Sequence, residues 1–168
     1  LEEKNKLLGN FIGVTQIEKI ADRELIIEAV FEEMDVKKEI FTKLNKICPS
    51  DTILASNTSY LDINEIAKVI NNPERMLGMH FFSPANIMKL LEIIVGEKTS
   101  ANTVATAFSL GKKMKKIPVR SGVCDGFIGN RILSKYLVAT YHMVEDGASI
   151  YDIDTVSYTH LRAHETEA

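Results

Sequence analysis

The sequence predicts an α/β fold followed by the beginning of an all-α domain. Over the first 120 residues, short β-branched runs alternate with longer amphipathic stretches, which is the pattern of strand–helix–strand units around a parallel sheet. From about residue 127 to residue 146 the alternation gives way to one long helical stretch. This change of pattern predicts a domain boundary near residues 122–126.

Five strands are expected where apolar and β-branched residues form short runs. They cover residues 25–30, 52–56, 76–82, 90–95 and 118–120.

Four helices are expected between and after these strands, at residues 35–47, 61–70, 103–114 and 127–146. The first shows apolar residues at helical spacing and is followed by Pro49, which closes its exit. Gly147 provides the stop for the last.

Composition limits the function classes. The chain has 168 residues, of which 45% are hydrophobic and 26% charged, and its net charge of -3 gives no indication of nucleic-acid binding. No run approaches the roughly 20 apolar residues of a membrane span. Cys48 and Cys124 are interpreted as small apolar fillers rather than a disulfide, and nothing at the start reads as a signal peptide. We therefore expect a protein of a reducing intracellular compartment.

The segment from His80 to Glu92 predicts a histidine–glutamate pair. One strand carries His80 to a turn at Pro84, and the next strand brings Glu92 back. A carboxylate bonded to one ring nitrogen fixes the tautomer and leaves the other nitrogen to take a proton. A lone histidine at a strand end is more often structural, so the weight comes from two companion motifs: Ser-Asn-Thr-Ser at 56–59 and Gly-Phe-Ile-Gly-Asn-Arg at 126–131.

The glycine-rich turn that cradles a dinucleotide, Gly-x-Gly-x-x-Gly after a first strand, does not occur in this sequence. Gly122, Gly126 and Gly129 come late, before the long helix, and we do not expect them to hold phosphate.

Three motifs in register, at 56–59, 80–93 (HFFSPANIMKLLEI) and 122–131 (GVCDGFIGNR), resemble the NAD-dependent L-3-hydroxyacyl-CoA dehydrogenase family. The sequences of the second and third motifs are most similar to the dehydrogenase region of multifunctional fatty-acid β-oxidation enzymes. The resemblance runs from about residue 22 to residue 156. It implies the C-terminal part of a Rossmann-like doubly wound sheet, followed by the start of an all-α C-terminal domain.

This resemblance also implies a domain plan. Residues 1–121 would be a partial NAD-binding domain without its first strands and glycine-rich turn, and residues 122–156 the start of a helical substrate and dimerisation domain. Residues 157–168 are expected to be a foreign or disordered tail, similar to translated adapter sequence. His160 and His164 lie there at i and i+4, but without the glutamate of a zinc-protease motif, so we expect no metal site.

Catalytic roles are implied residue by residue. His80 matches the family's general base and Glu92 its carboxylate partner. Ser59 and Asn130 match the polar groups that hold the substrate oxygen, and Ser59 also approaches the cofactor.

Cofactor contacts are implied in the same way for Ala29, Glu32, Lys37, Asn57 and Ser59, near the nicotinamide-side ribose and phosphates. NAD, rather than NADP, follows from the family alone. Two further groups are interpreted as structural or solvated: Glu28, as a charge at a strand end, and the lysines at 112, 113, 115 and 116, as a solvated helix end.

The function implied is oxidation of L-3-hydroxyacyl-CoA to 3-oxoacyl-CoA with NAD in fatty-acid β-oxidation. The substrate would be an acyl-CoA thioester, with no nucleic acid or membrane as partner, and the protein a homodimer or part of a larger multifunctional chain in a bacterial cytoplasm. The alternative is a non-catalytic fragment or interaction module that keeps the family framework, which the absent glycine turn favours.

Overall fold

The computed structural model describes residue 6 and residues 8–159. The chain divides into two compact units, Leu1–Phe127 and Ile128–Ala168, so the division follows the glycine cluster at 122–126 closely.

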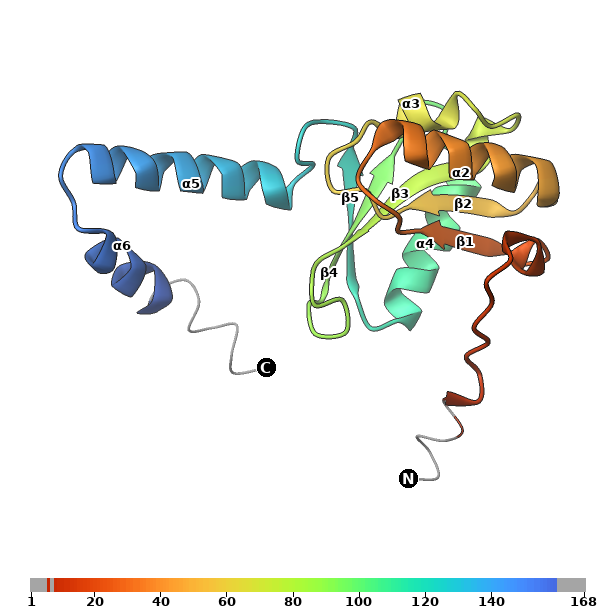
Figure 1. Cartoon of the computed structure of the whole chain (residues 1–168), viewed down its shortest axis with the longest axis horizontal. Coiled ribbons are helices and arrows are strands. Elements are labelled where there is room, and N and C mark those ends of the chain that lie inside the picture. Colours follow the sequence, from red (N-terminus) through yellow and green to blue (C-terminus); the bar gives the residue numbers. More distant parts are fainter. Residues whose placement is uncertain (1–5, 7, 160–168) are drawn as a thin grey trace. The chain divides into compact units, whose positions relative to one another are not determined.

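The first unit is built on a five-stranded sheet (Figure 1). Its strands lie in chain order across the sheet: β1 (Leu25–Glu28), β2 (Ile53–Ser56), β3 (Met76–Phe81), β4 (Leu90–Val95) and β5 (Ile117–Gly122).

The sheet is mixed: the alternation of strands and helices predicted parallel neighbours, and the turn predicted at Pro84 accounts for the one antiparallel pair. The pairs β1–β2, β2–β3 and β4–β5 are parallel, whereas β3 and β4 are antiparallel. The segment between Phe81 and Leu90 contains no helix and is too short for the crossover that parallel neighbours require. This short turn therefore places β4 directly beside β3 and antiparallel to it.

Helices cover both faces of this sheet, which confirms the predicted doubly wound α/β class (Figure 1). Helices α2 (Met34–Ile47) and α3 (Ile63–Ala67) pack on one face, and α4 (Ala101–Lys113) packs on the other. Short 3-10 turns, η1 (Ile17–Ile20) and η2 (Pro73–Arg75), complete the unit.

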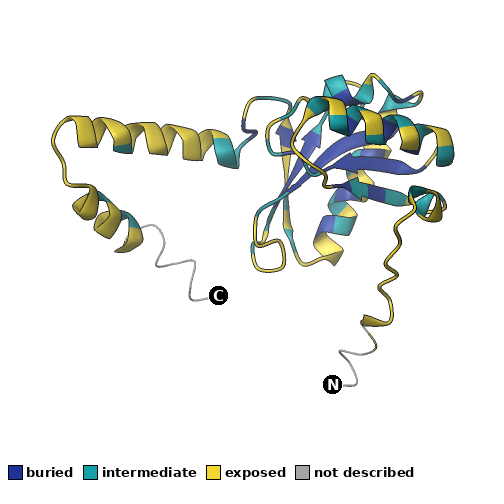
Figure 2. Cartoon of the chain, viewed as in Figure 1, coloured by how far each residue is buried: buried dark blue, intermediate teal, exposed yellow. Residues whose placement is uncertain are grey.

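Successive side chains of a strand point to opposite faces of the sheet, and this alternation determines which residues pack against which helices. Leu54 and Met76 join the core under α2 and α3, while their neighbours Ala55 and Leu77 join the core under α4. The central strands are accordingly buried along both faces (Figure 2).

Element boundaries differ from the predicted ones by a few residues. The Asp62 side chain accepts a hydrogen bond from the Asn64 N–H, so α3 begins at Ile63 rather than two residues earlier. Ser100 caps α4 in the same manner through the Thr103 N–H. Strand β1 ends at Glu28, two residues before the expected end.

The second unit consists of α5 (Gly129–Glu145) and α6 (Ile150–Ser157). Gly147, at a φ of +95°, separates them, in keeping with its predicted role as a stop. Helix α6 was not predicted: its last residue, Ser157, belongs to the segment interpreted as a tail, and its hydroxyl lies 2.7 Å from that of Tyr136. His160 and His164 lie outside the described residues.

Within the part of the chain described by the structure, no helix combines the length and apolar character needed to cross a membrane.

Gly78 lies where β3 closely approaches both β4 and α3. A Cβ placed there would lie 2.9 Å from Ile94 Cβ and 3.3 Å from Ile63 Cδ1. We expect Gly78→Ala to lower the free energy of unfolding by about 1–3 kcal/mol, because strand and helix must separate to admit the methyl group. Urea unfolding measures this against Gly122→Ala, whose Cβ would meet nothing within 4 Å. Equal stability of the two variants would contradict it.

Candidate active site

His80 and Glu92 face each other across the antiparallel pair. The register of β3 and β4 sets them directly opposite, and His80 Nδ1 lies 2.6 Å from Glu92 Oε2. The side chains are 5% and 0% exposed. Opposite residues of an antiparallel pair project on the same face, so the sheet itself supplies this contact. The carboxylate occupies Nδ1, which leaves Nε2 as the ring nitrogen that could take a proton.

Aromatic rings surround the imidazole within the first unit. The centroid of the Phe82 ring lies 4.5 Å from that of His80, and the centroid of Phe127 lies at 5.9 Å. Phe127 is fully buried and adopts a left-handed backbone conformation, with φ at 49°. Two apolar rings therefore pack near the buried imidazole, beside its contact with Glu92.

The turn between β3 and β4 is stabilised by hydrogen bonds from a lysine that follows α4. Lys116 donates hydrogen bonds to the carbonyl oxygens of Ala85 and Met88, the latter at 2.7 Å. Within the turn, the Met88 N–H donates to the Pro84 carbonyl at 3.0 Å. The interpretation of the lysine run as a solvated helix end was thus wrong for Lys116, which binds the turn that returns the chain to Glu92.

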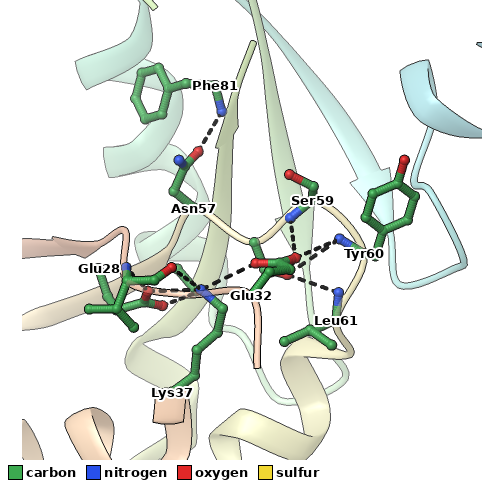
Figure 3. Close-up of polar contacts among 11 residues, drawn as sticks. Glu28, Glu32, Lys37, Asn57, Ser59, Tyr60, Leu61 and Phe81 are labelled. Atoms are coloured by element: carbon green, nitrogen blue, oxygen red, sulfur yellow. Dashed lines mark hydrogen bonds and ion pairs between the residues drawn. The ribbon is translucent and has the colours of Figure 1, made fainter. Parts of the chain in front are cut away.

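A second polar cluster lies where β1 and β2 end (Figure 3). At its centre is Lys37, from the first turn of α2, whose side chain is only 1% exposed. Its Nζ lies 2.8 Å from Glu28 Oε1 and 3.3 Å from Glu32 Oε2. Because a buried ammonium requires compensating charge, the two carboxylates explain how this lysine is accommodated.

Glu32 links this cluster to the turn after β2. Its Oε1 accepts hydrogen bonds from the Thr58 hydroxyl and from the N–H groups of Ser59, at 2.7 Å, and Tyr60, at 3.1 Å. Burial by itself would raise the pKa of the Glu32 carboxyl, but these three hydrogen bonds and the charge of Lys37 outweigh it and hold the pKa below its usual value.

This lowered pKa predicts an acid-sensitive contribution to stability. A carboxyl whose pKa is depressed by folding stabilises the folded state above its ordinary pKa, and the contribution is lost as pH falls through the folded value. We expect Glu32→Gln to cost stability at pH 7, and the difference from the wild type to shrink below about pH 4.5. Urea unfolding between pH 7 and pH 3 measures it, with the exposed Glu18→Gln as control. A difference that stays constant across this range would refute the assignment.

Asn57 connects the two clusters. Its Oδ1 accepts the N–H of Phe81, the residue after His80, at 2.8 Å, and its own N–H donates to the Glu28 carbonyl at 2.8 Å. The turn after β2 is therefore fixed to β1 on one side and to β3 on the other.

The residues chosen from the sequence fall into groups. The structure pairs His80 with Glu92 and joins Glu32, Lys37 and the backbone of Ser59 in one network. Ala29 is exposed just after β1. Asn130 lies in the first turn of α5, in the second unit.

Glu28 is the functional candidate that sequence reasoning missed. It was interpreted as a strand-end charge, yet it is 4% exposed and bonds to both Lys37 and the Ser56 hydroxyl. A carboxylate in an apolar strand, followed by a lysine in the next helix, was the available signal.

The residues present fit the ribose side of a dinucleotide. The Glu32 side chain is 37% exposed, and its Oε2 contacts only the Lys37 ammonium at 3.3 Å among the contacts within the described residues, so it can accept a hydrogen bond from a ribose hydroxyl. The Lys37 side chain is 1% exposed, and its ammonium already contacts both carboxylates. The sequence holds no glycine-rich turn for the pyrophosphate.

These features define the class of protein. Three neighbouring parallel strands, helices on both faces and polar side chains at the carboxyl ends of β1 and β2 form a Rossmann-like domain, in which ligands bind at this edge of the sheet.

Comparison with known families names the class more closely. The family model described as "3-hydroxyacyl-CoA dehydrogenase, NAD binding domain" matches residues 1–124, and the one for the C-terminal domain of the same family matches residues 126–162. The chain belongs to the 3-hydroxyacyl-CoA dehydrogenase family.

Individual relatives agree. The chain is 48% identical over 138 residues to a peroxisomal bifunctional enzyme of Danio rerio, covering 82% of this chain and 19% of the relative. It is 43% identical over 152 residues to a 3-hydroxybutyryl-CoA dehydrogenase of Clostridioides difficile, covering 90% of this chain and 54% of the relative.

A solved structure of 3-hydroxybutyryl-CoA dehydrogenase from Escherichia coli matches with a TM-score of 0.88 at 37% identity, over 94% of this chain and 33% of that one. The chain spans about a fifth of the length of the peroxisomal relatives that it matches.

Proposed function

We propose that this chain contributes the reaction centre of an NAD-dependent 3-hydroxyacyl-CoA dehydrogenase of fatty-acid β-oxidation. The observation that carries the proposal is the buried His80–Glu92 pair at 2.6 Å, in a chain of this family. The reaction is oxidation of L-3-hydroxyacyl-CoA to 3-oxoacyl-CoA.

Proton transfer is the task of His80 in this proposal. Bound NAD would supply the hydride acceptor, C4 of the nicotinamide. His80 Nε2 takes the proton of the substrate hydroxyl as its carbon is oxidised, and returns it in the reverse direction. Glu92 on Nδ1 fixes the ring and stabilises the imidazolium, and the apolar rings around His80 exclude water from the exchange.

Substrate and cofactor would be held by the remaining residues of the site. Ser59 and Asn130 bind the substrate oxygen, and Ser59 also adjoins the cofactor. Glu32 accepts a hydrogen bond from the ribose, and the exposed Ala29 leaves room for the dinucleotide where β1 ends. Asn57 would act through its amide nitrogen, because its oxygen already binds the Phe81 N–H.

The wider setting follows the relatives. We propose residues 1–121 as part of the NAD-binding domain and residues 122–156 as the start of the helical domain, within a homodimer or a multifunctional chain. Several relatives are peroxisomal by name, whereas a 3-hydroxybutyryl-CoA dehydrogenase relative comes from a bacterium. The cytoplasmic location expected from the sequence stays a prediction.

NADH-dependent reduction of acetoacetyl-CoA tests the proposal. The assay is run on the 168-residue chain and on the full-length product of its gene. Turnover by the latter supports the dehydrogenase. A well-folded full-length product that neither binds NADH nor turns over would replace it with the alternative, a non-catalytic module that keeps the family framework.

A further inference from the structure

We propose that Glu28 is a positioning residue for the cofactor side of this site, acting through Lys37 on Glu32; the inference rests on the dehydrogenase function proposed above. Nothing in the sequence motifs assigns Glu28 a role. Its position is unusual for a merely solvated charge, since it closes β1 and is buried on the face of the sheet covered by α2 and α3.

The three donors that bind the Glu28 carboxylate lie on three different parts of the fold. Its Oε1 accepts the Val30 N–H at 2.6 Å and the Lys37 ammonium at 2.8 Å, and its Oε2 accepts the Ser56 hydroxyl at 2.6 Å. The residue thus joins the loop after β1, the first turn of α2 and the end of β2. Its charge is what permits an ammonium at the centre of this region.

Lys37 carries the effect to Glu32. An ammonium has three N–H donors, and three acceptors surround this one: Glu28 Oε1, Glu32 Oε2 at 3.3 Å and the Val30 carbonyl at 3.5 Å. The lysine therefore has no donor left for a ligand. Its influence on a bound dinucleotide passes through the orientation of Glu32.

Glu32 in turn holds the turn on which Ser59 lies. One carboxylate oxygen binds the N–H groups of Ser59 and Tyr60, and the other faces Lys37 (Figure 3). Because Lys37 is shared between two carboxylates, Glu32 keeps its contact with the turn and an oxygen able to accept a ribose hydroxyl. Without the charge of Glu28, the ammonium has Glu32 as its sole anionic partner in the network and draws it away from both.

Glu28→Gln tests this sequence of contacts in the full-length product of the gene. We expect the dissociation constant and the KM for NADH to rise about tenfold, the loss typical of a hydrogen bond to a charged group, with kcat at saturation changed less than threefold. Hydrogen exchange of the Ser59 and Tyr60 amides should become faster. Glu28→Asp, which restores the charge, should recover part of the affinity.

A matched control separates positioning from loss of stability. Thr103 is a buried residue of α4, the helix on the opposite face of the sheet, and Thr103→Val removes the hydrogen bond that its Oγ1 donates to the Glu74 carbonyl. It should destabilise the protein without changing the KM for NADH or the exchange of the two amides. If Glu28→Gln fails to fold, Glu28→Gln with Lys37→Gln removes the buried charges together. With no ammonium to draw Glu32 away, this double variant should keep slow exchange of the two amides, and faster exchange in it would overturn the role of Lys37 in the coupling.

The outcomes distinguish the two proposals. Unchanged amide exchange and unchanged NADH affinity in Glu28→Gln would overturn the positioning role. An equal change in Thr103→Val would overturn it too, because the effect would then be general destabilisation. A third outcome is that amide exchange becomes faster in Glu28→Gln but not in Thr103→Val, while the wild-type protein binds no NADH. This result would support the coupling of Glu28 to the Ser59 turn and overturn the dehydrogenase function.

Discussion

Replacing His80 with glutamine is expected to abolish turnover of acetoacetyl-CoA by the full-length product of the gene, while NADH binding stays nearly intact. Glutamine can still donate and accept hydrogen bonds, but it cannot take a proton at neutral pH. Losing a general base typically costs about 10²–10⁴-fold in rate. Steady-state kinetics give kcat, and fluorescence titration with NADH gives the binding constant.

The control for this variant is His142→Gln. His142 lies on α5 with its side chain 70% exposed, paired with Glu145 at 3.1 Å, and the same substitution there should leave kcat unchanged. A His80→Gln enzyme with near-normal turnover would remove His80 from the role of base. Lost NADH binding would instead show that the substitution disturbed the fold around β3.

Lys37→Met is expected to destabilise the folded protein by about 3–5 kcal/mol, because it leaves Glu28 buried with no opposite charge. The side chains are similar in length, so packing changes little. Urea unfolding at pH 7 measures the loss. Lys43→Met is the matched control on the same helix: Lys43 is 52% exposed and pairs with Glu39 at 2.6 Å, and exposed pairs contribute about 0–1 kcal/mol.

A second comparison identifies the cause of that loss. Glu28→Leu combined with Lys37→Met replaces the buried ion pair by apolar side chains and should recover much of the stability. If the double variant is as unstable as Lys37→Met alone, the loss comes from packing rather than from the stranded carboxylate.

The His80–Glu92 contact was accessible from the sequence because it is local. Two strands joined by a short turn leave few possible registers, and a histidine and a glutamate at positions that oppose each other are visible in the printed order of residues. The doubly wound class was equally accessible, since hydrophobic periodicity survives without knowledge of tertiary contacts.

The network around Lys37 was not accessible in the same way. Its members come from β1, the following loop, α2 and the turn after β2, and they meet only when the parallel crossover is complete. The resemblance implied a cofactor contact for Lys37, which stays a prediction. Glu28 was interpreted as a strand-end charge because periodicity gives no information about which charges are buried together. The antiparallel direction of β4 followed from the predicted turn at Pro84, because the alternation of strands and helices does not by itself fix strand direction.

The direct pairing of residues on β3 and β4 has a consequence for how this part of the gene can vary. Side chains alternate between the two faces of a strand, so inserting or deleting one residue within β3 would turn His80, and within β4 would turn Glu92, toward the face covered by α4; either change would separate the pair. Substitutions that keep the strand lengths would be tolerated far more readily. The pairing of His80 with Glu92 therefore depends on the number of residues in each strand more than on the identity of their neighbours.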